Sequence, residues 1–191
     1  MTHAATTRNR VRIISGNWRR RLIFFPDAEG LRPTPDAVRE KLFNWLGQNL
    51  DGLDCLDLFA GSGVLGFEAA SRGARRVVMV EKNRRVLGAL QASVTALAAD
   101  NVVLVSADGV TYLLENKARF DVIFLDPPYA VGLQAQALAV LASHLNRDAR
   151  VYVEHDGGLV APAGWVVWRA GRAGKAHFCL LKQAQAQDAH A

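Results

Sequence analysis

The sequence contains few of the residues from which disulfides and metal centres are built. Only two cysteines occur in 191 residues, Cys55 and Cys179, and no CxxC pair is present. Both lie in apolar, strand-like stretches, so we expect two buried, reduced thiols. The five histidines lack the spacing of metal ligands, and no constellation of serine, cysteine and histidine predicts a nucleophile. We therefore expect no metal and no nucleophilic side chain.

Long hydrophobic runs are also missing. No apolar stretch approaches the roughly 20 residues that a membrane-spanning helix needs, although half of the residues are hydrophobic. The first stretch, MTHAATTRNRVRIISG, is basic but has no apolar run before a small-residue cleavage site. We therefore expect a cytoplasmic protein without a secretion signal. The length suits one domain with a sizeable core and a small appendage.

Acidic residues are absent from one part of the chain. Between residues 8 and 21 the sequence has six arginines and no aspartate or glutamate. Residues 1–50 hold nine Lys and Arg against four acidic residues, and this excess equals the net charge of +5 of the whole chain. Because arginine suits phosphate groups and stacking on bases, the patch predicts a polyanionic partner. The alternative is a solvated basic arm that only aids solubility.

The hydrophobic pattern changes along the chain from a hairpin to a strand–helix alternation. Residues 10–14 and 18–25 alternate like two strands, and a helix follows with Thr34 as its N-cap and Pro35 as its first residue. Short loops between alternating elements predict an α/β fold with a doubly wound, mostly parallel seven-stranded sheet, whose last two strands are antiparallel across a GRAG link. Strands are expected at 53–60, 75–81, 102–108, 120–128, 149–156, 164–170 and 175–182, and helices at 64–73, 84–97, 109–117 and 133–145.

Polar residues follow four of the predicted strands at the point where each strand ends. They are the stretch 57–66, Glu81, Asp108 and Asp126. Ligands of such sheets bind outside the carboxyl ends of the strands. We therefore expect a ligand site at this edge.

The stretch GSGVLG at residues 61–66 matches the GxGxxG pattern of nucleotide-binding loops. Glu81 lies twenty residues after Gly61, where an acid takes ribose hydroxyls. This pattern alone does not separate nicotinamide cofactors from other ligands that carry a ribose. Asp57 favours a cationic ligand, because a carboxylate would repel a pyrophosphate by about 1 kcal/mol in water and by several times more when desolvated. S-adenosylmethionine, with its ammonium and sulfonium groups, meets that requirement.

The third strand ends in SADG, where Asp108 can accept a hydrogen bond from an adenine amino group beside the Gly109 N–H. For Asp57 the alternative role is a helix N-cap or loop acid. The predicted cofactor-binding residues are Asp57, Gly61, Ser62, Gly63, Glu81, Lys82, Asp108 and Gly109.

These motifs resemble those of class I S-adenosylmethionine-dependent methyltransferases, in the stretches LDLFAGSGVLGFEAASRGA, VEKN, SAD and DVIFLDPPY. The N-terminal stretches RIISGNWRRRLI and GLRPTPDAVREKLFNWL narrow the resemblance to the bacterial methyltransferases that modify the exocyclic N2 amine of one guanine in 16S ribosomal RNA. The likeness covers roughly residues 10–182. Two departures stand out, because Ser15 occupies a position where we expect glycine and Arg20 one where a small residue is common.

The resemblance implies S-adenosylmethionine as cofactor, 16S ribosomal RNA in a small-subunit particle as substrate, and a monomer. It implies an RNA-contacting extension over residues 1–50, a methyltransferase domain over 51–182 and a polar, disordered tail over 183–191. The patch and the resemblance together predict RNA-binding roles for Arg10, Arg12, Trp18, Arg19, Arg20, Arg21 and Arg32.

In this family context the DPPY stretch, residues 126–129, would activate the amine. An exocyclic amine is a poor nucleophile because its lone pair is delocalised into the ring. The Asp126 side chain and the Pro127 carbonyl can accept its two N–H groups and aim the lone pair at the methyl group. Pro127 and Pro128 fix the backbone and remove competing donors, while Tyr129 can stack on a flipped-out base. These four residues are the predicted catalytic set; a strand-ending turn with an N-cap acid is the alternative.

Other functions stay open at this point. An enzyme with the same DPPY site could methylate adenine N6 in DNA or RNA, and a catalytically silent RNA-binding assembly factor could keep the same fold. The intact glycine loop argues against the second, and Asp57 argues against a nicotinamide oxidoreductase. Asp121 and Glu154 are expected to be structural, although Glu154 could reach the edge of the base.

Overall fold

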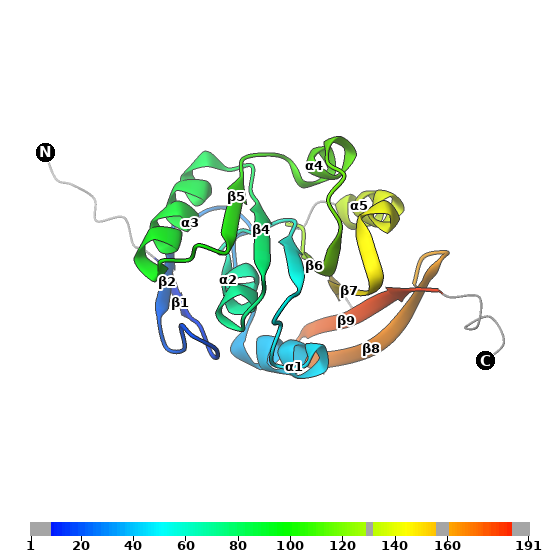
Figure 1. Ribbon diagram of the computed structural model, residues 1–191, viewed down its shortest axis with the longest axis horizontal. Coiled ribbons are helices and arrows are strands. Elements are labelled where there is room, and N and C mark those ends of the chain that lie inside the picture. Colours follow the sequence, from blue (N-terminus) through cyan, green and yellow to red (C-terminus); the bar gives the residue numbers. More distant parts are fainter. Residues whose placement is uncertain (1–8, 129–131, 156–160, 185–191) are drawn as a thin grey trace, which may run out of the picture.

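The computed structural model describes residues 9–128, 132–155 and 161–184 (Figure 1). Within these ranges no helix has both the length and the apolar character needed to cross a membrane. The chain forms two sheets and five α-helices in the described part. The elements are β1 (Asn9–Arg12), β2 (Leu22–Phe25), α1 (Asp36–Leu46), β3 (Asp54–Asp57), α2 (Val64–Ser71), β4 (Arg76–Val80), α3 (Arg84–Leu97), β5 (Val102–Val105), α4 (Gly109–Glu115), β6 (Phe120–Leu125), α5 (Leu133–Leu141), a 3₁₀ turn (Ala142–His144), β7 (Leu145–His155), β8 (Trp165–Ala173) and β9 (Ala176–Gln183).

The larger sheet has seven strands in the order β5-β4-β3-β6-β7-β9-β8. Strands β3 to β7 pair in parallel, and β9 pairs antiparallel with both β7 and β8. This confirms the predicted doubly wound fold. The GRAG stretch is not a loop, however. Pairing continues to Ala173 opposite Ala176, and the turn needs only Gly174 and Lys175, with Gly174 at φ 60°.

Helices cover both faces of this sheet, so two apolar cores form. One core lies between the sheet and α4 and α5. The other is larger and is built from α1, α2, α3 and the inner residues Ile13 and Ile23 of the N-terminal hairpin. The hairpin therefore packs as part of this layer, beside α3 in Figure 1. Cys55 and Cys179 are both buried and free, as predicted.

The N-terminal elements differ in detail from the sequence prediction. Strands β1 and β2 are shorter than predicted, since residues 13–21 form a loop whose backbone donors partly serve α2 rather than the opposite strand. The prediction of Thr34 as helix N-cap was wrong. Pro35 caps α1 without a side-chain hydrogen bond, and its carbonyl accepts from the Val38 and Arg39 N–H groups.

Candidate active site

The parallel strands bring the predicted polar residues to one edge of the sheet. Asp57 is the last residue of β3 and pairs with Phe124 on β6. Asp126 lies two residues after Phe124, just beyond the end of β6. Glu81 directly follows β4, and Asp108 lies just beyond β5 and begins α4. Burial is the main cause that raises the pKa of Asp57 and of Asp126, and a smaller effect of Glu81 on Asp57 and of Asp57 on Asp126 shows that these three carboxylates lie near one another.

The glycine loop between β3 and α2 is held by Glu81. Its two carboxylate oxygens accept from the Gly61 N–H at 3.0 Å and from the Asn83 N–H at 2.7 Å. Gly63 has φ 77°, and a Cβ there would lie 2.5 Å from the Leu90 side chain, so only glycine fits. Ser62 is buried, with Oγ 3.4 Å from the Val64 N–H. The loop thus presents backbone rather than side chains.

Asp57 is buried beneath this loop. Its side chain is 3% exposed and accepts from the Gly66 N–H of α2 at 3.0 Å. Burial is the main cause that raises the pKa of Asp57 to about 7; the Gly66 hydrogen bond opposes the shift, and the charge of Glu81 contributes to it. The predicted loop-acid role and a role toward a cation are compatible, since a cation bound nearby would stabilise the carboxylate.

Asp108 and Gly109 form the start of α4. Oδ1 of Asp108 caps the helix by accepting from the Val110 and Thr111 N–H groups, at 3.0 and 3.3 Å. Its other oxygen lies 3.9 Å from Nζ of the exposed Lys82. A Cβ on Gly109 would come within 2.8 Å of the Leu58 carbonyl oxygen, so the helix start is packed against the end of β3.

Asp126, Pro127 and Pro128 extend β6 beyond its last paired residue. Burial, together with the charges of Glu154 and Asp57, raises the pKa of Asp126 to about 7. Pro127 is half-buried and Pro128 is exposed. Tyr129, the fourth member of the predicted catalytic set, lies outside the described residues.

Two features near Asp126 were missed in the sequence. Gly30 and Leu31, between β2 and α1, approach the edge. A Cβ on Gly30 would lie 3.8 Å from Cβ of Pro128, and a Cβ on Gly61 would meet the Leu31 side chain at 2.9 Å. This segment therefore lies against both the glycine loop and the proline pair. No local pattern in the sequence predicts such a contact, because it joins residues about 30 and 100 positions apart.

The second missed feature is a hydrogen bond on β7. The Tyr152 hydroxyl, on a fully buried side chain, donates to Oε1 of Glu154 at 2.6 Å. Burial raises the pKa of Glu154, and this hydrogen bond opposes the shift. Asp121, by contrast, is structural as predicted, because it accepts from the Asp54 N–H and the Asn146 amide.

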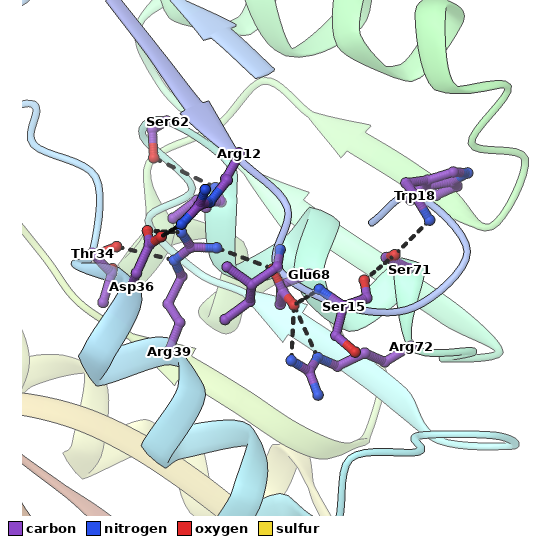
Figure 2. Close-up of polar contacts among 12 residues, drawn as sticks. Arg12, Ser15, Trp18, Thr34, Asp36, Arg39, Ser62, Glu68, Ser71 and Arg72 are labelled. Atoms are coloured by element: carbon purple, nitrogen blue, oxygen red, sulfur yellow. Dashed lines mark hydrogen bonds and ion pairs between the residues drawn. The ribbon is translucent and has the colours of Figure 1, made fainter. Parts of the chain in front are cut away.

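A buried ion-pair cluster joins the hairpin loop to α2 (Figure 2). Glu68 is fully buried and accepts from the backbone N–H groups of Ile14 and Ser15, at 2.9 and 3.0 Å. It also pairs with the buried Arg39 at 3.0 Å and Arg72 at 2.9 Å. We call these five residues the Glu68 cluster. It fixes the hairpin loop against the helix that starts at the glycine loop.

The tip of the hairpin is held at the far end of the same helix. The Trp18 N–H donates to Oγ of Ser71, the last residue of α2, and the Asn17 N–H donates to the Ser71 carbonyl. Gly16 approaches so closely that a Cβ would lie 1.9 Å from that carbonyl oxygen. Trp18 is half-buried and packs against the core, so it offers less free ring than the sequence suggested.

The predicted RNA-binding arginines fall into two groups. Helix α2 runs from the glycine loop to Ser71, over about 12 Å at 1.5 Å per residue. The tip of the hairpin therefore lies near the amino ends of the parallel strands, whereas Asp126 lies at their carboxyl ends. Arg19, Arg20 and Arg21 are exposed at this tip, and Arg21 donates to the Ala96 carbonyl at the end of α3. The other group is Arg10, Arg12 and Arg32, all exposed, with Arg12 paired to Asp36 at 3.1 Å.

The described residues contain no group of three or more His, Cys, Asp or Glu side chains able to hold a metal ion.

Arg20 has φ 69°, a left-handed conformation that glycine adopts more easily. This explains in backbone terms why a smaller residue suits that position.

Comparisons with known proteins agree on one family. A family model described as "Conserved hypothetical protein 95" matches residues 11–182. "Ribosomal RNA small subunit methyltransferase D" of Escherichia coli is 39% identical over 91% of this chain and 90% of its own length. The protein of that name in Haemophilus influenzae is 38% identical over 90% of this chain and 93% of its own.

Solved structures agree with this result. "Putative methyltransferase yhhF" from Escherichia coli superimposes with a TM-score of 0.81 at 36% identity, covering 92% of this chain and 98% of that one. A ribosomal protein L11 methylase from Lactobacillus delbrueckii has a TM-score of 0.61 at 18% identity, covering 78% of this chain and 79% of that one. The second likeness concerns the fold alone.

Proposed function

The chain belongs to the family described as Conserved hypothetical protein 95, and from this premise we propose that it transfers a methyl group from S-adenosylmethionine to the exocyclic N2 amine of a guanine in 16S ribosomal RNA. The observation that carries the proposal is the arrangement at one sheet edge. A glycine loop over a buried acid, Asp57, lies beside a rigid Asp-Pro-Pro stretch, and the methyltransferase relatives share the whole domain.

The residues at this edge fit S-adenosylmethionine. The 61–63 loop lies next to Glu81, and each Glu81 oxygen keeps a lone pair for a ribose hydroxyl. Oδ2 of Asp108 is free of the helix cap and can accept from an adenine amino group beside Gly109. Asp57 supplies the negative charge that favours an ammonium and a sulfonium, since a cation bound nearby would stabilise its carboxylate. Ser62 and Lys82 complete the proposed cofactor site. When bound, S-adenosylmethionine supplies an electrophilic methyl group.

The chain's part in the reaction is to orient the amine. We assign Asp126 as acceptor of one N2–H and the Pro127 carbonyl as acceptor of the other, so that the nitrogen lone pair faces the methyl group. Pro128 keeps the backbone rigid, and Tyr129 is assigned to stack on the flipped-out base. Positioning of this kind gives effective molarities of about 10⁵ M or more. The surplus proton of the methylated amine passes to Asp126 or to water.

RNA binding is assigned to the two arginine groups and to the exposed edge of Trp18. Arg10, Arg12 and Arg32 would hold phosphates near the target base. The tip arginines would hold a second stretch of the ribosomal RNA at the opposite edge, which suits a folded particle better than a short single strand.

The decisive experiment uses S-adenosylmethionine with a tritiated methyl group and undermodified small-subunit particles. Digestion of the RNA and chromatography of the nucleosides should give label in N2-methylguanosine. Label in N6-methyladenosine would replace the proposal with the adenine alternative. Particle binding without label would indicate an assembly factor. Calorimetry supplies an independent check, since tighter binding of NAD than of S-adenosylhomocysteine would exclude the proposed cofactor.

A further inference from the structure

We propose that Glu154 is a specificity-determining residue that accepts the N1–H of the target guanine next to Asp126. This inference rests on the proposed guanine-N2 activity and adds to it the residue that separates guanine from adenine. The Glu154 side chain has no part in the proposed activation of the amine, which relies on Asp126 and the Pro127 carbonyl.

The register of two neighbouring strands places Glu154 beside Asp126. Strands β6 and β7 are parallel, and Phe124 and Leu125 pair with Tyr152 and Val153. The rings of Phe124 and Tyr152 lie 6.4 Å apart on the same face of the sheet. Since side chains alternate along a strand, Asp126 and Glu154 project to that same face from strands about 4.8 Å apart. Asp57 projects there too, through its pairing with Phe124.

Tyr152 fixes the Glu154 carboxylate. Its hydroxyl donates to Oε1 at 2.6 Å from a fully buried ring, so that oxygen has a defined position. Within the described ranges, Oε2 has no hydrogen-bond partner, and no lysine, arginine or histidine forms an ion pair with Glu154. The half-buried residue thus presents one oriented, unneutralised acceptor beside Asp126.

Guanine and adenine differ in what they would present to this acceptor. The Watson–Crick edge of guanine carries two adjacent donors, N1–H and N2–H, so two neighbouring carboxylates match it. Adenine carries an amino donor next to N1, which is an acceptor and would face the Glu154 carboxylate with its lone pair. Sites built to bind a donor can reject analogues that lack it by factors of up to about 10⁴–10⁵. Since Glu154 is half-exposed, we expect a smaller factor.

The competing role for Glu154 is purely structural, as the partner of the buried Tyr152 hydroxyl. The two roles differ in what a Glu154→Gln substitution should do. An amide still accepts from Tyr152, so a structural role is preserved. The amide can also donate, and so it should accommodate an unprotonated N1.

The experiment uses 2-aminopurine, which keeps the N2 amine but has an unprotonated N1 and no O6. Reconstituted small-subunit particles carry guanine or 2-aminopurine at the position that the wild-type enzyme methylates. The kcat/KM ratio for the two bases is measured for the wild type, for Glu154→Gln and for Glu115→Gln, a control at an exposed residue at the end of α4. Loss of O6 affects every enzyme alike, so comparing the ratios isolates residue 154.

We expect the wild type to prefer guanine by about 100-fold and Glu154→Gln to reduce that preference at least about tenfold. Glu115→Gln should keep it. Tyr152→Phe should reduce it about threefold and raise KM more than it lowers kcat, because the carboxylate loses its orientation. A Glu154→Gln preference within about twofold of the wild type would overturn this inference alone. Absence of N2-methylguanosine with the wild type would instead overturn the proposed function.

Discussion

Replacing Glu68 by glutamine tests whether the hairpin is anchored by the Glu68 cluster. The carboxylate accepts five N–H groups, from the Ile14 and Ser15 backbone and from Arg39 and Arg72. An amide keeps only one oxygen, turns its NH₂ toward several of those donors, and leaves two buried guanidinium groups without a buried counter-charge. Removing one partner of a buried ion pair typically costs about 3–5 kcal/mol. Domains of this kind are stabilised by about 5–15 kcal/mol, so the variant should fold but with much reduced stability.

The matched control is Arg75→Gln. Arg75 contacts Asp54 at 3.0 Å, the same distance as Arg39 to Glu68, but its side chain is 64% exposed whereas that of Arg39 is fully buried. Exposed pairs contribute about 0–1 kcal/mol. Urea unfolding measures the free energy of unfolding of both variants, and amide hydrogen exchange at Ile14 and Ser15 reports local detachment of the hairpin. A loss below about 1 kcal/mol in Glu68→Gln with unchanged exchange would refute the anchoring role.

Four further predictions concern the site and the hairpin. Because the pKa of Asp57 is raised to about 7, a cationic ligand should displace its proton; affinity for S-adenosylmethionine should rise up to tenfold per pH unit below about pH 7 and level off above it. Calorimetry should show a weaker trend for S-adenosylhomocysteine, which lacks the sulfonium charge, and none in Asp57→Asn, and equal trends would contradict the argument. Asp126→Ala should lower kcat about 10²-fold or more with cofactor affinity nearly unchanged, whereas wild-type turnover would mean that the amine is activated elsewhere. Replacing Arg19, Arg20 and Arg21 together should flatten the slope of log RNA affinity against log salt by about two units, and an unchanged slope would make the tip a solvated surface. Arg20→Gly alone should raise the free energy of unfolding by about 0.5–1 kcal/mol, by removing left-handed strain, and a loss of stability in urea unfolding would show that the arginine makes a contact of its own.

The sequence was sufficient for the strand–helix alternation and for the edge where polar residues gather. Both depend on local periodicity and on the rule that ligands bind at strand carboxyl ends. α3 begins and ends where predicted, since Asn83 caps it with hydrogen bonds inside the same short segment. The antiparallel end of the sheet was predicted as well; β8 is longer than predicted, and β9 is shifted by one residue.

Contacts between distant segments were not predictable. The loop 13–21 departs from hairpin geometry because Glu68, more than fifty residues away, accepts its backbone donors. The approach of Leu31 to Gly61 and the alignment of Glu154 with Asp126 depend on the packing of separate elements and on the register between two strands. Pro35, not Thr34, is the N-cap of α1, because the Pro35 carbonyl accepts the first hydrogen bonds of the helix, from the Val38 and Arg39 N–H groups.

The close approach of Gly16 to Ser71 has a consequence for protein engineering. Gly16 faces solvent, and an exposure map would mark it as free to vary, yet any side chain there would collide with the end of α2. Position 16 should be as intolerant of substitution as a core residue, whereas replacing the exposed Arg19 should leave the folding of the hairpin unchanged. A chimera that carries this hairpin on another enzyme would therefore need both the glycine at position 16 and the C-terminal end of α2 against which it packs.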